Sequence, residues 1–239
     1  MAFQKVSVVG PQASQFAPVK NQLAQPTNEV SDFKGYFKVE TYPHNAVIYR
    51  PTDTADKMFL LKSGRVRILR SGKGTARSVL ALLKAGDMFG DVLRTEGAQM
   101  NEMAVAQGEA EVWSIEGRDL QALIEARPQI AMEVLTGLND RLRSYRQRVQ
   151  GLTFKDVPAR LADTLLALSE THGERCPHGG EFDLRQITQQ DLADLVGASR
   201  SFVSTLINEM KRDGVLGNVG RILCVKDQKA LRKVAGVEK

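Results

Sequence analysis

Two different hydrophobic patterns divide the chain. From residue 33 to about residue 115, short apolar or β-branched runs alternate with glycine-bearing turns at spacings of roughly 8–12 residues. Many short strands at such spacing are typical of a β-sandwich or barrel rather than of βαβ units. Gly64 and Gly86 occupy turns that favour a positive φ. The expected strands are Ala46–Tyr49, Met58–Leu61, Val66–Leu69, Ser78–Leu83, Met103–Ala106 and Ala110–Ile115.

A helical pattern follows the strands. A short helix over Arg118–Ala126 is ended by Pro128, and the longest helix of the chain is expected over Gln129–Leu152. Apolar residues recur along this second helix at alternating spacings of three and four, which predicts a heptad seam for a parallel homodimer. The alternative is a helix that packs only on its own β-domain. The seam residues are Leu135, Leu138, Leu142, Tyr145, Val149 and Leu152.

The last third of the chain contains a helix-turn-helix pattern. An amphipathic helix over Ala159–Ser169 and a short strand pair within Glu181–Ile187 precede it, and a hairpin over Val215–Val225 follows it. Thr188 and Asp191 match a capping pattern that begins a helix. Three further residues complete the pattern: the small residue Ala193 where two helices would cross, Gly197 in the turn, and Ser199 as the N-cap of a second helix. This arrangement is typical of helix-turn-helix DNA-binding motifs.

The second helix of this motif has one polar and one apolar face. We expect the apolar face, formed by Phe202, Val203, Leu206, Ile207 and Met210, to be buried. A guanidinium and short hydroxyl side chains on the other face suit the major groove, where Arg200 would bind guanine O6 and N7 with two hydrogen bonds. The candidate residues for base readout are Arg200, Ser201, Ser204 and Thr205.

Composition narrows the class of protein. The 239 residues are 42% hydrophobic and 26% charged, with a net charge of +5, which excludes a wholly disordered chain and suits a nucleic-acid partner. We expect a cytoplasmic protein with no membrane contact, because no apolar stretch approaches ~18 residues and only two cysteines occur. Residues 1–32, rich in Gln, Pro, Ser and Asn, are expected to form a flexible tail.

No catalytic pattern is visible, so we expect no enzymatic activity and no cofactor. The chain contains no G-x-S-x-G or P-loop motif. Metal-dependent enzymes of the cupin type need several His and Glu ligands inside their barrel, and His44 is the only histidine in the strand-rich region.

The motifs together resemble the CRP/FNR superfamily of transcription regulators. The resemblance covers residues 33–225 and rests on K-S-G-R-V at 62–66, G-D-M-F-G-D at 86–91, D-V-P-A-R-L-A-D-T-L-L at 156–166 and I-T-Q-Q-D-L-A-D-L-V-G-A-S-R at 187–200. It implies an α+β fold with a cyclic-nucleotide-binding-like β-roll (jelly roll) at 33–128 and a dimerisation helix at 129–152. A winged helix-turn-helix domain that binds double-stranded DNA is implied at 153–239.

The resemblance also assigns contacts residue by residue. It implies that Arg200 reads guanine, that Thr188, Gln189 and Ser199 contact DNA phosphates, and that Arg221 in the wing approaches the backbone. The chain departs from the family at two positions. Ser201 replaces a common glutamate and Thr205 replaces a second common arginine.

The ligand pocket of the family is degenerate here. Gly90 and Asp91 stand in the G-E-L motif, Met100 and Asn101 replace the Arg-Ser pair that binds the cyclic phosphate, and Tyr145 and Arg146 replace the Thr-Ser pair that binds adenine. Without the arginine and serine the phosphate loses charge-assisted hydrogen bonds, so we do not expect cyclic AMP to bind there. Two alternatives stay open: the protein binds another effector, such as a cyclic dinucleotide, or it binds no effector. The cysteine cluster of the oxygen-sensing branch is absent, since no cysteine precedes Cys176.

One segment between the amphipathic helix and the strand pair holds metal-ligand residue types. His172, Cys176 and His178 are close in sequence, but a fourth ligand is missing and we expect no metal. The resemblance implies that the loop Pro177, His178, Gly179 and Gly180 contacts RNA polymerase.

These features lead to one functional expectation. The chain is expected to be a sequence-specific transcription regulator that acts as a homodimer on a palindromic operator, without cyclic AMP. The alternative is a module that senses a cyclic nucleotide or dinucleotide and acts mainly through a protein partner.

Overall fold

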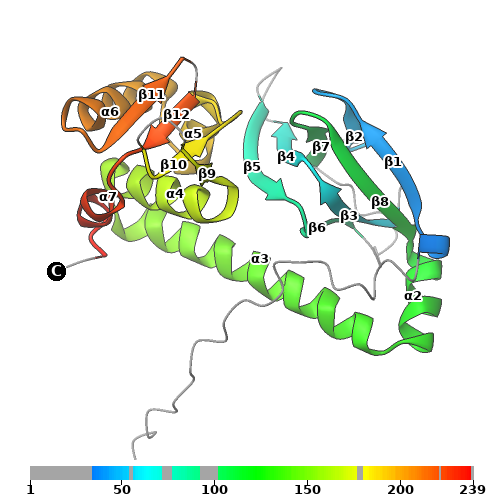
Figure 1. The fold of residues 1–239 in the computed structure, drawn as a ribbon. Coiled ribbons are helices and arrows are strands. Elements are labelled where there is room, and N and C mark those ends of the chain that lie inside the picture. The colour runs from blue at the N-terminus through cyan, green and yellow to red at the C-terminus, as the bar shows by residue number, and fades with distance from the viewer. Residues whose placement is uncertain are drawn as a thin grey trace, which may run out of the picture.

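A β-roll and a smaller helical domain lie side by side, joined by one long helix (Figure 1). The structure, a computed structural model, describes residues 34–53, 56–71, 77–91, 102–176, 180–220 and 222–237. The tail expected at 1–32 lies outside these residues.

The β-roll consists of two antiparallel four-stranded sheets. A short 3-10 helix, η1 (Lys34–Tyr36), precedes the first strand. One sheet has the order β1 (Lys38–Tyr42), β8 (Ala110–Glu116), β3 (Lys57–Ser63) and β6 (Met88–Asp91). The other has the order β2 (Val47–Tyr49), β7 (Glu102–Ala106), β4 (Arg65–Ser71) and β5 (Arg77–Lys84). The six expected strands are confirmed, whereas β1 and β6 were not expected.

Aromatic side chains fill the space between the two sheets. The rings of Tyr49, Phe59 and Phe89 stack with centroid distances of 5.2–6.2 Å, and aliphatic side chains surround them. The chain turns tightly at Gly64 and Gly86, whose φ angles are +83° and +94°, as the sequence predicts. At Gly64 a Cβ atom would lie 2.2 Å from a backbone oxygen, so a side chain is excluded there.

Two helices leave the roll. Helix α2 (Gly117–Ala126) buries Leu120 and Leu123 in a small cluster with the roll. Pro128 directly precedes α3 (Gln129–Phe154). Helix α3 runs from α2 past the roll to the C-terminal domain (Figure 1). Both helices are confirmed, and α3 is two residues longer than expected. Among the described residues, no helix is long and apolar enough to cross a membrane.

The C-terminal domain surrounds a single hydrophobic core. Its helices are α4 (Val157–His172), α5 (Gln189–Val196), α6 (Arg200–Arg212) and α7 (Gln228–Val234). Its sheet has the order β11 (Leu216–Val219), β12 (Ile222–Val225), β10 (Phe182–Leu184) and β9 (Glu174–Arg175). The hairpin expected at residues 215–225 is therefore confirmed as β11 and β12.

The sequence prediction was wrong at two places in this domain. The strand pair expected within residues 181–187 is the single strand β10, whose antiparallel neighbours are β12 and β9. Three residues are too few for a pair, and the chain turns directly afterwards through Gln186 at a φ of 65°. Helix α7 was not expected at all, although Asp227 caps it by accepting a hydrogen bond from the Ala230 N–H.

Candidate nucleic-acid interface

Helix α5 begins with a reciprocal capping box. The Thr188 hydroxyl accepts a hydrogen bond from the Asp191 N–H at 3.1 Å, and the Asp191 carboxylate accepts one from the Thr188 N–H at 2.8 Å. The helix ends at Gly197, whose φ of 71° is the left-handed conformation of a helix C-cap. The predicted start and turn of the helix-turn-helix are therefore confirmed.

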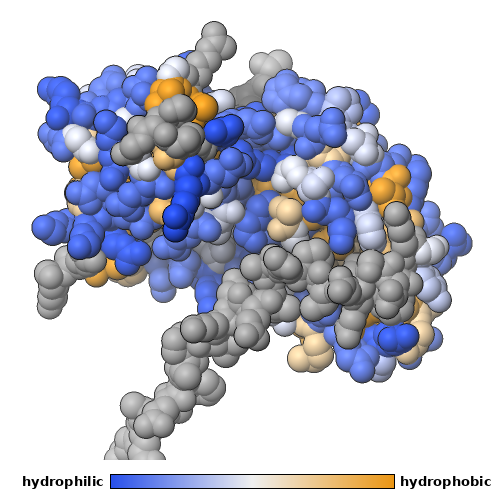
Figure 2. All heavy atoms as spheres, viewed as in Figure 1, coloured by the Kyte–Doolittle hydropathy of each residue, from blue (hydrophilic) through white to orange (hydrophobic). Residues whose placement is uncertain are grey.

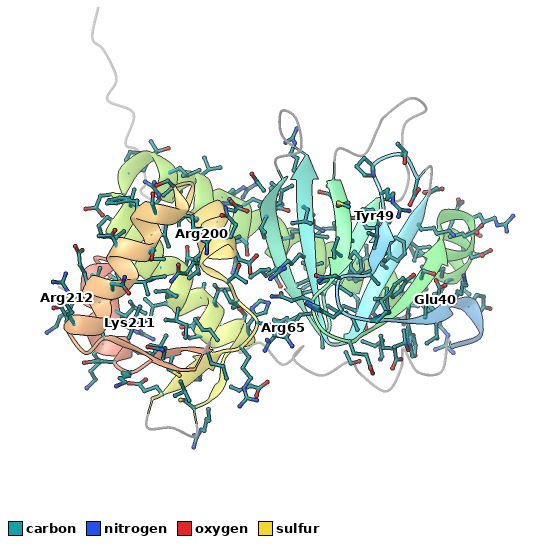
Figure 3. All side chains as sticks on the ribbon, turned by 90° about the horizontal axis from the view of Figure 1, so that it is seen from above. Glu40, Tyr49, Arg65, Arg200, Lys211 and Arg212 are labelled. Carbon is teal, nitrogen blue, oxygen red and sulfur yellow. The ribbon has the colours of Figure 1, made fainter. Side chains whose placement is uncertain are left out.

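The second helix of the motif, α6, presents its N-terminal turn to solvent. The Ser199 hydroxyl caps it by accepting from the Phe202 N–H at 3.2 Å. Arg200, Ser201 and Thr205 are exposed and Ser204 is half-buried. Figure 3 labels Arg200 at one end of α6 and Lys211 and Arg212 at the other. Cationic and hydroxyl groups thus share the outward side of this helix.

The inward side of α6 differs from the prediction at one residue. Val203, Leu206, Ile207 and Met210 are buried in the domain core as expected. Phe202, expected in the core, is instead 45% exposed. At about 100° per residue, its position in the helix lies at the edge of the apolar face. An aromatic ring is thus available beside the polar side chains of this helix.

Three of the four residues expected to contact phosphates lie at helix N-termini. Thr188 and Ser199 are exposed N-caps of α5 and α6, and Gln189 is half-buried in the first turn of α5. Unpaired N–H groups and the positive end of the dipole make helix N-termini suitable for anions. Arg221, which falls between β11 and β12 in the sequence, lies outside the described residues.

The roll holds the helix-turn-helix through charged contacts that sequence reasoning missed. Arg67 of β4 forms an ion pair with Asp191, with 2.8 Å between Nη2 and Oδ2. On β5, the Val79 N–H donates to the Asp194 carboxylate at 2.9 Å. Arg148 of α3 donates to the Leu80 carbonyl of the roll at 2.8 Å and to the Asp194 carbonyl at 2.7 Å. The first helix of the motif is therefore fixed to both the roll and α3.

A second arginine of β4 extends this interface. Arg65 donates to the backbone carbonyls of Arg185 and His172, and Figure 3 shows it between the roll and the C-terminal domain. Burial, together with the nearby charges of Arg65 and Lys84, lowers the pKa of His172 to about 4. The alternation Arg65, Val66, Arg67 is the sequence signal for this surface, since residues two apart point to the same side of a strand.

The exposed side of α3 carries most of the predicted dimer seam. Leu135, Leu138, Leu142, Val149 and Leu152 are exposed apolar side chains, and Met132 continues their row toward the start of the helix. Tyr145 is half-buried instead, and its hydroxyl accepts a hydrogen bond from Arg141 Nε at 3.2 Å. On the face that Figure 2 shows, hydrophobic residues form small separate patches.

The structure describes only part of the degenerate pocket. Gly90 lies in β6 at a φ of +97°, Tyr145 is half-buried and Arg146 is exposed. The Asp91 side chain, Met100 and Asn101 lie outside the described residues. Near Tyr145, Tyr49 donates a hydrogen bond to the Glu102 carboxylate at 3.1 Å, and burial raises the pKa of the Tyr49 phenol. Tyrosine and charged side chains thus occupy the side of the roll that faces α3.

The segment expected to contact polymerase is described only in part. Gly180 is half-buried before β10, whereas Pro177, His178 and Gly179 lie outside the described residues. In the part that the structure describes, no three His, Cys, Asp or Glu side chains gather into a metal site. His172 is buried against the roll, and Cys176 lies beside Cys224.

Both domains match known families. Residues 39–127 match the cyclic nucleotide-binding domain, and residues 159–234 match the Crp-like helix-turn-helix domain. The cyclic AMP receptor protein of Thermus thermophilus is 30% identical over 188 residues, which are 79% of this chain and 83% of that protein. A CRP-like cAMP-activated global transcriptional regulator of Mycobacterium tuberculosis is 27% identical over 195 residues, covering 81% of this chain and 86% of the relative.

Solved structures show the same architecture. A mutant of CooA from Carboxydothermus hydrogenoformans superposes with a TM-score of 0.72 at 25% identity, over 88% of this chain and 95% of that one. A CRP-family transcriptional regulator from Thermus thermophilus superposes with a TM-score of 0.69 at 25% identity, over 82% and 96% of the two chains. These relatives are transcription regulators rather than enzymes.

Proposed function

Since the chain belongs to the CRP/FNR superfamily of DNA-binding transcription regulators, we propose that two copies of it bind a palindromic operator through α6 without cyclic AMP. The observation that carries this proposal is the exposed, capped N-terminal turn of α6, where Arg200 stands among hydroxyl side chains. An α-helix with such a turn fits the major groove, and arginine is the usual partner of guanine there.

The row of exposed apolar residues on α3 supports the homodimer. A row of exposed apolar side chains that repeats every three to four residues is typical of a helix that a partner helix covers. A two-fold axis along α3 would place two copies of α6 about 34 Å apart, one turn of DNA. Such a dimer reads the same half-site twice, in opposite directions, which is why a palindrome is proposed.

The pocket residues support independence from cyclic AMP. The names of the Thermus and Mycobacterium relatives refer to cyclic AMP, but this chain has Met100 and Asn101 where the family binds the phosphate. Arg146, at the second adenine position, is exposed. For the loop 177–180, a contact with RNA polymerase is part of the same proposal and rests on the resemblance alone.

One experiment tests base readout. An operator is first selected from random duplexes with the purified protein and no added nucleotide, and gel-shift titrations then compare operator with scrambled DNA. Arg200→Ala should weaken operator binding by about 10²–10⁴-fold in a dimer, since each bidentate contact is worth roughly 1–3 kcal/mol. Scrambled DNA should lose much less, because phosphate contacts are retained. Arg221→Ala should weaken both duplexes alike.

Arg212→Ala is the matched control, because Arg212 is an exposed arginine at the opposite end of the same helix. It should leave the preference for operator over scrambled DNA unchanged. Equal losses on both duplexes for Arg200→Ala would show that this arginine binds phosphate rather than guanine. Selection of an operator only in the presence of cyclic AMP would contradict the proposed independence from that nucleotide.

A further inference from the structure

The only two cysteines of the chain lie next to each other in the C-terminal domain. The Sγ atoms of Cys176 and Cys224 are 3.4 Å apart, although 48 positions separate the residues in sequence. Cys224 belongs to β12 and is 2% exposed, whereas Cys176 directly follows β9 and is half-buried. Cys176 is thus the more exposed of the two cysteines.

The backbone restrains the two cysteines to different degrees. Cys224 is held in the middle of the sheet, opposite Gly217 of β11 and Asp183 of β10. Cys176 stands in the connection between β9 and β10, where its N–H donates to the Glu181 carbonyl at 3.3 Å. A disulfide requires about 2.05 Å between sulfurs, so the pair must close by about 1.4 Å. We assign most of this movement to Cys176, because the sheet restrains Cys224.

A neighbouring glycine leaves room for the Cys176 sulfur. A Cβ atom built at Gly180 would lie 3.3 Å from Cys176 Sγ, closer than ordinary van der Waals contact. A larger residue at position 180 would therefore push the Cys176 side chain away from its present place. The absence of a side chain at Gly180 is part of what brings the two sulfurs together.

We propose that Cys176 and Cys224 form a reversible disulfide when the protein meets a hydroperoxide, and that this bond fixes the wing hairpin β11–β12. In the first step, written for hydrogen peroxide, the Cys176 thiol gives up its proton and its sulfur attacks one peroxide oxygen. The O–O bond breaks, a sulfenic acid forms, and the hydroxide that leaves takes up the thiol proton to become one water. In the second step the Cys224 thiol attacks the sulfenic sulfur, the S–S bond forms, and the hydroxyl leaves as a second water. The two sulfurs lose two electrons and the peroxide gains them.

The position of the bond explains its expected effect. In the sheet order β11-β12-β10-β9, the disulfide would connect β12 to the chain at the end of β9, across β10. Two residues before Cys176, Glu174 lies 3.8 Å from Arg65 of the roll. Oxidation would therefore tie the wing to the edge of the domain that contacts the roll. In a reducing compartment such a bond is transient, which suits a sensor of oxidants.

The test uses the full-length protein treated with hydrogen peroxide and then with dithiothreitol. Intact mass and alkylation counting should show a loss of about 2 Da and of both alkylatable thiols within one chain, and dithiothreitol should reverse it. Hydrogen exchange of the amides at residues 216–225 should slow by about tenfold on oxidation. Cys176→Ser should abolish both effects while retaining the reduced exchange rates.

A second variant, Cys224→Ala, tests the proposal in case Cys176→Ser does not fold. Cys224→Ala is chosen because a buried serine hydroxyl there would need a hydrogen-bond partner, whereas alanine would not. It should also lose both effects of peroxide. The proposal is overturned if peroxide gives only disulfides between chains or only sulfinic acid. It is also overturned if the intrachain disulfide forms and exchange at residues 216–225 does not change.

Discussion

Removal of the Arg67 guanidinium should loosen the C-terminal domain from the roll. Arg67 Nη2 is 2.8 Å from Asp191 Oδ2, and the two side chains are only 19% and 4% exposed. Loss of one partner of a buried ion pair typically costs ~3–5 kcal/mol, because the other charge stays buried. Asp191 retains its hydrogen bond from the Thr188 N–H, and the Arg67 side chain is not fully buried. We therefore expect Arg67→Met to lower the free energy of unfolding by about 2–3 kcal/mol.

Two probes in one urea titration can localise the loss. Trp113, the single tryptophan of the chain, is buried in β8 and reports on the roll by fluorescence, whereas far-UV circular dichroism is weighted toward the helices. In the wild type the two transitions should coincide, because the ion pair of Arg67 and the hydrogen bonds of Arg148 couple the two domains. In Arg67→Met the helical signal should be lost at a lower urea concentration than the tryptophan signal.

A double-mutant cycle isolates the pair itself. Asp191→Asn retains an oxygen for the capping box but removes the charge, so its combination with Arg67→Met should give a coupling free energy of about 1–3 kcal/mol. Arg118→Met is the control, because Arg118 is 80% exposed beside Glu116 and should change stability by less than ~0.5 kcal/mol. A coupling free energy near zero would refute the buried ion pair, and with it the docking of α5 on β4.

Three further changes test other parts of the structure. Because the pKa of His172 is about 4 when folded and ~6.5 when unfolded, acidification from pH 7 to pH 4 should remove about 3 kcal/mol of stability that His172→Leu does not lose, as urea unfolding at each pH would show. Thr188→Ala should cost ~1 kcal/mol through loss of the α5 cap, and equal wild-type and variant melting temperatures would contradict this. Leu142→Asp should halve the mass measured by light scattering, whereas Arg143→Ala on the same exposed helix should leave it unchanged.

The sequence predicted the elements whose side chains alternate clearly between core and solvent. Strand β4 and helix α6 belong to this group, since buried residues recur in them with the period of a strand or a helix. Strand β1 does not, because it is an edge strand with a mostly exposed face. The start of α5 and the start of α6 were predictable because capping is local, and depends on residues within three positions of each other.

The contacts between domains were not predictable in the same way. Arg67 and Asp191 are 124 positions apart, and nothing in either segment alone indicates the other. The helical periodicity also gave a wrong prediction for Phe202, which was expected in the core and is exposed. Phe202 lies at the edge of the apolar face of α6, where periodicity does not distinguish a core residue from a surface residue. The DNA-contacting roles of Arg200 and Ser199 are predictions from motif and resemblance, and geometry alone places them on an exposed turn.

The two hydrogen bonds of Arg148 couple the orientation of α3 to the position of the helix-turn-helix. One guanidinium is shared between a carbonyl of the roll and a carbonyl of α5. A turn of α3 by one residue, about 100°, would withdraw that guanidinium from both carbonyls at once. The apolar row on the outer side of α3 would turn by the same angle. In the proposed homodimer, a molecule that changes how the two copies of α3 pair would therefore also change the orientation of α6, without contacting the helix-turn-helix.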